Sequence, residues 1–197
     1  MFESLAKYLV EKGSLTGDEL RLVEEVTIPK KIRKHQYLLQ EGDVSHFQSF
    51  VAKGCLRLYR VGEDGRDHIM RFAIENWWIN DYSSYQSGQP SRYNIDALEN
   101  SELLMIEKGK FNYLVETIPN FKNLIEQLTA NNYEAHQNRI FSNISDTAEE
   151  KYDNFLRTYS TIYDRVPLHM IASFLGLSRE TLSRVRQQHA RKRRNDP

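Results

Sequence analysis

Residues 166–188 contain two short amphipathic segments joined by a turn of only three residues. The apolar residues of the first segment recur at helical spacings: Leu168, Ile171, Ala172 and Leu175. Gly176 can adopt the left-handed conformation that ends a helix, and Ser178 can cap the helix that follows. Leu182 and Val185 give this second helix an apolar face toward the first. The pattern predicts a helix-turn-helix, whose second helix enters the major groove of DNA.

The outward face of the second helix is polar and mostly basic. The candidate DNA-binding residues on or near it are Ser178, Arg179, Glu180, Thr181, Ser183, Arg184 and Arg186. Arg179 stands in the first turn, where a cation opposes the helix dipole by a few tenths to about 1 kcal/mol, which favours a dedicated anionic or base partner. Arginine can bind guanine through two hydrogen bonds, and Glu180 can accept one from cytosine. Each charge alone could be an ordinary solvated one, but their grouping favours base reading.

The charge of the chain is unevenly distributed, although 27 Lys and Arg balance 27 Asp and Glu. Residues 167–197 hold seven basic and two acidic side chains, a net charge of +5, so the remainder carries −5. The basic run at 191–194 is expected to contact phosphates without reading sequence. Overall neutrality therefore conceals a basic C-terminal end.

Between residue 26 and about residue 106 the hydrophobic period is two. Met70, Phe72 and Ile74 alternate with Arg71 and Ala73, as in a half-buried strand. Turn sequences at 41–43, 52–54 and 62–65 are spaced as in a sandwich or roll of antiparallel strands. Two short helices over residues 2–24 are expected to precede this region.

A long helix is predicted from residue 118, because residues of its first turns recur at steps of three and four. The candidate dimer seam on this helix is Phe121, Ile125, Leu128, Asn132 and Ala135. Such a seam could pack on the chain's own β domain or on a second copy of the chain. A polar residue in an apolar seam is a known device for fixing register, so Asn132 favours a dimer. A further helix, over about 145–159, begins the C-terminal domain.

Together these segments predict an α+β fold with an N-terminal antiparallel β-roll, a long connecting helix and a C-terminal helix-turn-helix. The expected domains are a β-roll sensor with flanking helices at 1–117, the dimerisation helix at 118–143 and the DNA-binding domain at 144–197. No internal repeat or low-complexity tract interrupts them.

Several functional classes are disfavoured. The six histidines show neither Ser-His-Asp nor metal-ligand spacing, so we expect no enzyme, no metal and no cofactor. Cys55 is the only cysteine and is expected to be a small buried side chain. No apolar run approaches the about 20 residues of a membrane span, and the N-terminus does not read as a secretory signal. We therefore expect a cytoplasmic protein.

The chain resembles the Crp/Fnr family of bacterial transcription regulators over nearly its whole length. The strongest match is the segment at 178–184, Ser-Arg-Glu-Thr-Leu-Ser-Arg, which is similar to the recognition helix of the family. The segments at 39–43 and 54–65 also resemble the first strands of its β-roll. The resemblance implies that Arg179, Glu180 and Arg184 read bases. Little follows His189, so the β-hairpin wing usual in the family is expected to be missing.

The ligand-binding motif departs from that of the cyclic-nucleotide-binding members, in which a Glu binds the ribose and an Arg binds the cyclic phosphate. Asp81 stands where the resemblance implies the Glu, and Arg92 is displaced by about one residue, which in a strand turns a side chain to the other face. Cyclic AMP is therefore not expected to control the protein. The candidate pocket for another effector is Trp78, Asp81, Tyr82 and Arg92. The alternative interpretation is that Trp77 and Trp78 are residues of the hydrophobic core.

The resemblance implies a regulator that binds an inverted-repeat operator as a homodimer. Its expected partners are double-stranded DNA and a second copy of the chain. RNA polymerase and an unknown small-molecule effector are further candidate partners. The alternative is a ligand-binding or protein-interaction module that uses the roll and binds DNA without specificity.

Overall fold

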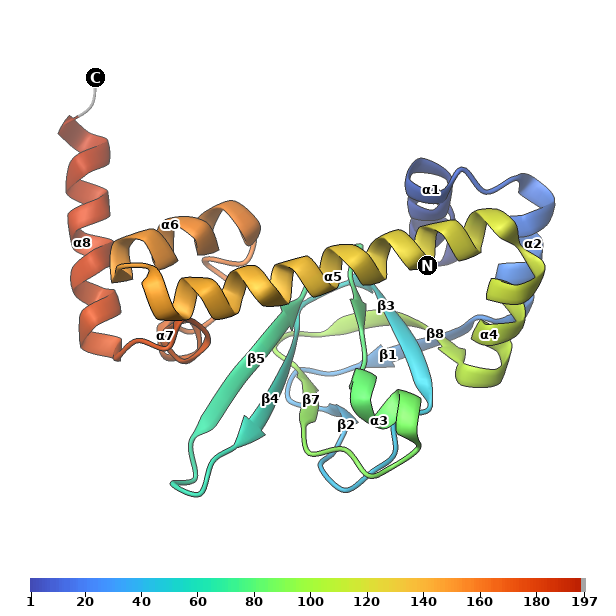
Figure 1. Cartoon of the computed structure of the whole chain (residues 1–197), viewed down its shortest axis with the longest axis horizontal. Helices are drawn as coiled ribbons and strands as arrows, with labels where there is room; N and C mark the ends of the chain where they lie inside the picture. Colours follow the sequence, from blue (N-terminus) through green and yellow to red (C-terminus); the bar gives the residue numbers. More distant parts are fainter. Residues whose placement is uncertain (196–197) are drawn as a thin grey trace.

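The structure, a computed structural model, describes residues 1–195, with side chains to residue 191. A β-roll lies at the centre, with helices α1 (Phe2–Gly13), α2 (Gly17–Val26) and α4 (Lys108–Thr117) at one end (Figure 1). The C-terminal helices lie at the other end, and α5 (Pro119–Ser145) runs across the molecule between them. The predicted α+β fold is confirmed.

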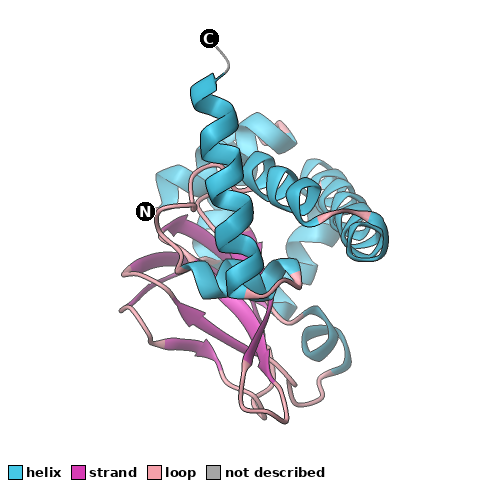
Figure 2. Cartoon of the chain, turned by 90° about the vertical axis from the view of Figure 1, so that its left-hand side faces the viewer, coloured by secondary structure: helices cyan, strands magenta, loops and turns pink. Residues whose placement is uncertain are grey.

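Two four-stranded antiparallel sheets form the roll, in the orders β1-β8-β3-β6 and β2-β7-β4-β5. The strands gather in one region, with helices beside and above it (Figure 2). Their bounds are β1 (Ile28–Ile32), β2 (Tyr37–Leu39), β3 (Phe47–Lys53), β4 (Leu56–Val61), β5 (Asp67–Ala73), β6 (Trp78–Ile79), β7 (Asn94–Ala97) and β8 (Ser101–Glu107). A short helix, α3 (Tyr82–Ser87), interrupts the region that the sequence predicted as strands alone.

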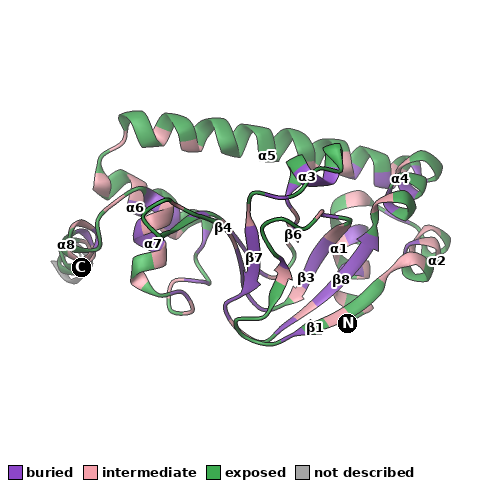
Figure 3. Ribbon diagram, turned by 90° about the horizontal axis from the view of Figure 1, so that it is seen from below, coloured by how far each residue is buried: buried purple, intermediate pink, exposed green. Residues whose placement is uncertain are grey.

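The first half of α5 packs on the chain's own helices. Phe121 is fully buried, and Phe111 of α4 lies 5.3 Å from its ring centroid. Ile125 and Leu128 contact the same cluster, which also holds Leu5 and other apolar residues of α1. Residues 129–138 are all exposed (Figure 3). The apolar steps of the predicted seam therefore bind α5 to its own domain.

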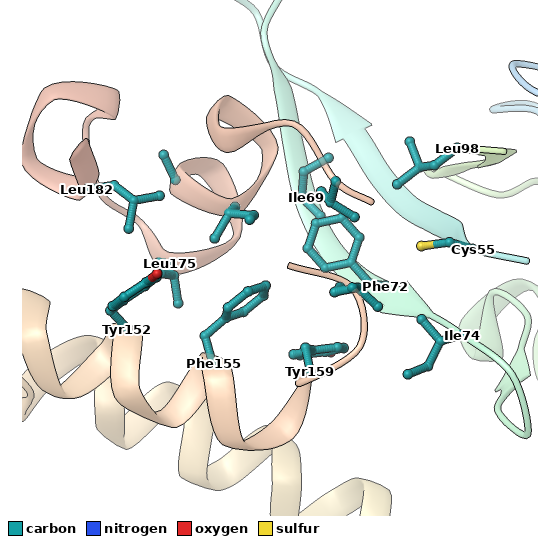
Figure 4. Close-up of a cluster of buried hydrophobic side chains, with 14 of the residues drawn as sticks. Cys55, Ile69, Phe72, Ile74, Leu98, Tyr152, Phe155, Tyr159, Leu175 and Leu182 are labelled. Carbon is teal, nitrogen blue, oxygen red and sulfur yellow. The ribbon is translucent and has the colours of Figure 1, made fainter. Parts of the chain in front are cut away.

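The C-terminal helices share a hydrophobic cluster with the outer face of the roll. Phe155 lies in α6 (Ala148–Thr158), and Tyr159 lies in the turn that follows it. Both rings pack against Phe72 of β5, with centroids 6.4 and 6.0 Å from that of Phe72 (Figure 4). Cys55 lies in this cluster, fully buried as expected, and burial raises the pKa of its thiol to about 12. The helix-turn-helix is thus docked on the roll through apolar contacts.

Candidate nucleic-acid interface and effector pocket

The predicted helix-turn-helix consists of α7 (Leu168–Leu175) and α8 (Arg179–Asn195). Gly176 ends α7 with φ 66°, and the Leu177 N–H donates to the Ala172 carbonyl over 2.9 Å. The Ser178 hydroxyl then accepts a hydrogen bond of 3.1 Å from the Thr181 N–H and so caps α8. Both local signals in the sequence act as predicted.

Buried residues fix which face of α8 turns inward. Leu182 and Val185 pack against Ile171, Ala172 and Leu175 of α7 in one cluster. Helical geometry then places Glu180, Arg184, Gln187 and Arg191 on the opposite face, and all four are exposed. The inward packing of α8 therefore presents a continuous polar face away from the body of the chain.

The DNA-binding residues predicted from the sequence differ in their solvent exposure. Ser178, Arg179, Glu180 and Arg184 are exposed, whereas Thr181 and Ser183 are half-buried. Arg186 lies at the flank, where its guanidinium stacks over the Tyr163 ring at 4.7 Å from the centroid. Six of the seven therefore lie on or beside the outer face of the first two turns, and Arg186 is held by an aromatic ring.

Gln187 is an exposed residue of this face that was not among the DNA-binding residues predicted from the sequence. Its spacing of three from Arg184 and seven from Glu180 is the signal that could have found it. The helix also continues to Asn195, beyond the end at residue 188 that the sequence suggested. Arg191 extends the exposed face, and the side chains at 192–194 lie outside the described residues.

The electrostatics of the first turn favour an ionised acid beside a cation. The pKa of Glu180 is lowered because its carboxylate accepts hydrogen bonds from its own backbone N–H and from the Ser178 side chain. Glu180 is therefore an acceptor, and Arg179 and Arg184 are exposed donors, so the face offers both kinds of hydrogen bond.

Polar contacts position the helix-turn-helix against β5. The Ser173 hydroxyl accepts from the Ile69 N–H over 3.0 Å and donates to the Asp67 carbonyl over 2.8 Å. Arg139 of α5 donates to the Phe174 carbonyl over 3.1 Å and to the carbonyls of Ile69 and Met70. Helix α7 is thus held by hydrogen bonds to the roll and to α5.

One ion-pair group reinforces this docking, and a second joins strands of the roll beside it. Arg165 lies between the carboxylates of Glu75 and Glu99 and hydrogen-bonds both. Arg57 pairs with Asp96 over 2.8 Å and, at the edge of α7, with Asp67 over 2.8 Å. These arginines join segments that are far apart in the sequence.

The four residues predicted to form an effector pocket differ in burial: Asp81 is buried, Trp78 is half-buried, and Tyr82 and Arg92 are exposed. Trp78 packs outside the roll interior, with ring centroids of Phe50 and Phe111 at 5.3 and 6.0 Å. Tyr82 is 61% exposed and Arg92 is exposed. Trp77 lies on the opposite side from Trp78, 5.3 Å from the Tyr159 ring.

Asp81 is buried and has two intramolecular partners. Its carboxylate caps α3 by accepting from the Ser83 N–H over 3.0 Å, and it accepts from the Ser91 hydroxyl over 2.7 Å. Asp81 is thus a structural acceptor that organises the segment between β6 and β7. A cavity of about 340 Å³ does open in the roll, lined by Ile79 and Asn80 but by none of the four predicted residues.

Comparisons with known proteins agree with this architecture. A sequence model of the cyclic nucleotide-binding domain matches residues 29–117. The probable transcriptional activator of Rhizobium leguminosarum bv. viciae is 25% identical over 191 residues, 91% of this chain and 78% of the relative. The nitrogen fixation regulation protein FixK of Bradyrhizobium diazoefficiens is 26% identical over 184 residues, 88% of this chain and 76% of the relative.

A solved structure shows the same fold. FixK2 from Bradyrhizobium japonicum superposes with a TM-score of 0.72 at 19% identity, covering 85% of this chain and 86% of FixK2. The fold is that of the Crp/Fnr regulators.

The predicted dimer seam lies partly within the chain's own packing. Phe121 is fully buried, whereas Ile125 and Leu128 are half-buried against the N-terminal cluster. Asn132 and Ala135 are exposed but line a cavity against β5 and α6. The large apolar side chains of α5 that the structure exposes are Tyr133, Ile140, Phe141 and Ile144.

The described residues contain neither a candidate metal site nor a candidate membrane-spanning helix. No group of three or more His, Cys, Asp or Glu side chains among them could hold a metal ion. No helix in the described part of the chain is long and apolar enough to cross a membrane.

Proposed function

We propose that this chain, which has the Crp/Fnr fold, is a transcription regulator that reads a specific DNA sequence with α8. The observation that carries the proposal is the exposed face of Glu180, Arg184, Gln187 and Arg191 on a helix whose other face is buried against α7. Arginine and glutamine are side chains that hydrogen-bond base edges in the major groove. The similarity to a probable transcriptional activator of Rhizobium and to the regulation protein FixK of Bradyrhizobium supports the same conclusion.

A homodimer through the second half of α5 is the second part of the proposal. Ile144 is 82% exposed and Phe141 is 68% exposed, and they form one apolar patch with Tyr133 and Ile140, here called the α5 patch. Exposed apolar patches on a helix commonly mark an interface. A two-fold dimer would place two recognition helices about one DNA turn, 34 to 36 Å, apart on an inverted repeat.

Control by cyclic AMP is not part of the proposal. The acid at the ribose position, Asp81, already holds Ser91 and caps α3, and the displaced Arg92 is exposed. Any effector would therefore differ from a cyclic nucleotide. Because a transcription regulator acts at the chromosome, we place the protein in the cytoplasm and assign it no catalytic role.

The test is selection of bound fragments from random duplex DNA, followed by the same selection with Arg184→Ala. The wild type should enrich an inverted repeat, and Arg184→Ala should lose the preference at one base pair of each half-site. Arg60→Ala, an exposed arginine on β4, serves as the control and should enrich the same repeat. Absence of enrichment, with no retention on heparin at low salt, would favour the alternative of a ligand-binding or interaction module.

A further inference from the structure

A second cavity, of about 600 Å³, lies where the roll, α5 and the C-terminal helices meet. Its walls include Arg71 and Trp77 from the roll, His136 from α5, Tyr159 after α6 and Phe174 from α7. Cavities of 300 to 1,000 Å³ are typical of small-molecule sites. This second cavity shares no lining residue with the roll cavity and is therefore separate from it. We refer to it as the joint cavity.

Positive charge dominates the lining of the joint cavity. Arg71, Arg139, Lys151 and Arg157 contribute cationic side chains, and Asp146 is the one carboxylate among the described residues that line it. Asp146 already accepts hydrogen bonds from Asn154 over 3.2 Å and from Ser145. The cavity therefore has far more positive than negative charge.

Most of these cations have fixed partners, but Arg71 does not. Arg139 donates to three backbone carbonyls and lies 4.2 Å from the Phe174 ring centroid. Arg71 is half-buried, and within the described part of the chain its side chain forms neither a hydrogen bond nor an ion pair. Its guanidinium lies 5.8 Å from the centroid of the Trp77 ring. A partly desolvated guanidinium without an acceptor is a ready site for an anion.

The ionisation of His136 reflects the same uncompensated charge. Partial desolvation at the cavity wall lowers the pKa of His136, and the positive charges of Arg71 and Arg139 lower it further. A bound anion would oppose the effect of both arginines. His136 is therefore a natural reporter of occupancy.

Aromatic rings form the rest of the wall. The Trp77 and Tyr159 ring centroids are 5.3 Å apart, and Phe174 meets Tyr159 edge to face at 5.5 Å. Rings in such arrangements offer both faces and edges to a further flat ring. The cavity thus combines an unpaired cation with surfaces suited to an aromatic body.

We propose that the joint cavity binds a small aromatic anion, with its charged group at Arg71 and its ring beside Trp77, Tyr159 and Phe174. Because the walls belong both to the roll and to the helix-turn-helix, such a ligand contacts the two parts at once. This position suits an effector that changes how the recognition helix is held.

The test is calorimetric titration of the whole chain, without DNA, with benzoate, salicylate and phenylphosphate, and with neutral benzamide for comparison. At least one anion should bind one site per chain, and benzamide should bind about tenfold more weakly. Arg71→Met should weaken anion binding about tenfold, because it keeps the length of the side chain and removes its charge. Arg60→Met is the matched control on the exposed side of β4 and should bind as the wild type does.

A second variant removes the space instead of the charge. Ala135→Phe places a ring into the joint cavity from α5 and should abolish binding even if Arg71→Met fails to fold. Circular dichroism establishes folding of each variant, and the His136 imidazole resonances in NMR should report a raised pKa when an anion is bound. Lack of binding by all three anions up to about 10 mM, or equal binding by folded Arg71→Met and Ala135→Phe, would overturn the proposal. Because no DNA is present, failure here is separate from failure of DNA recognition.

Discussion

The hydroxyl of Ser91 donates a 2.7 Å hydrogen bond to the buried carboxylate of Asp81. This bond spans the short helix α3, whose first turn Asp81 also caps. It occupies the acid that the family resemblance assigns to a ribose hydroxyl, and it leaves the neighbouring arginine, Arg92, exposed. The segment is therefore arranged around its own internal contact.

Cyclic AMP should consequently fail to bind at ordinary cellular concentrations. A cyclic phosphate needs a positioned cation, and Arg92 is turned away from the buried side of its segment, where Ser91 and Asp81 lie. Isothermal titration calorimetry of the purified protein measures this directly. A micromolar dissociation constant would contradict the reading of Asp81 and Ser91 as a closed structural pair.

The Arg165 ion-pair group should make stability depend on acid. Burial alone would raise the pKa of Glu75, but hydrogen bonds from Arg165 and from the Gly54 N–H lower it overall. A carboxylate with a lowered pKa in the folded state contributes stability above its unfolded value of 4.5, and this contribution disappears as pH falls through the folded value.

Thermal unfolding followed between about pH 6 and pH 3 checks this expectation. The melting temperature of the wild type should fall as the pH drops below 4.5. Arg165→Met should have a lower melting temperature at about pH 6 and a smaller decrease over the same pH range. Arg66→Met removes an exposed pair with Asp64 and should behave as the wild type does. Equal slopes for wild type and Arg165→Met would show that Arg165 does not set the acid response.

The α5 patch should hold the dimer. Ile144→Asp puts a charge on its most exposed apolar residue, so the dimer dissociation constant should rise by roughly tenfold or more. Asn131→Asp adds the same charge at an exposed position on another side of α5 and should leave association unchanged. Analytical ultracentrifugation at micromolar concentration distinguishes the two. A wild-type monomer, or equal effects of both variants, would argue against this interface.

Local signals in the sequence were sufficient for the helix-turn-helix. Gly176, Ser178 and the apolar steps around them lie within some twenty residues and act through backbone conformation and capping, so no distant contact decides them. The missed Gln187 follows from the same helical spacing, applied one turn further.

Distant packing decided what the sequence could not settle. The period of α5 correctly placed Phe121, Ile125 and Leu128 on one face, but periodicity does not say whether that face meets another chain or the same one. Trp77 and Trp78 are adjacent in an extended segment and lie on opposite sides of it, but it is the packing of helices α1 and α4 that places Trp78 outside the roll interior. The six-residue helix α3 is too short to produce a clear period.

DNA titration of four single variants tests the central claim most directly. Arg179→Ala and Arg184→Ala remove exposed donors in the first two turns of α8, whereas Lys192→Ala and Arg193→Ala act where side chains lie outside the described residues. Each variant is titrated against the selected operator and a scrambled duplex at several salt concentrations. The first pair should lose about 1 to 3 kcal/mol on the operator alone, and the second should weaken both duplexes equally and lower the salt slope by about one. Equal weakening of both duplexes by Arg179→Ala and Arg184→Ala would contradict base reading by α8.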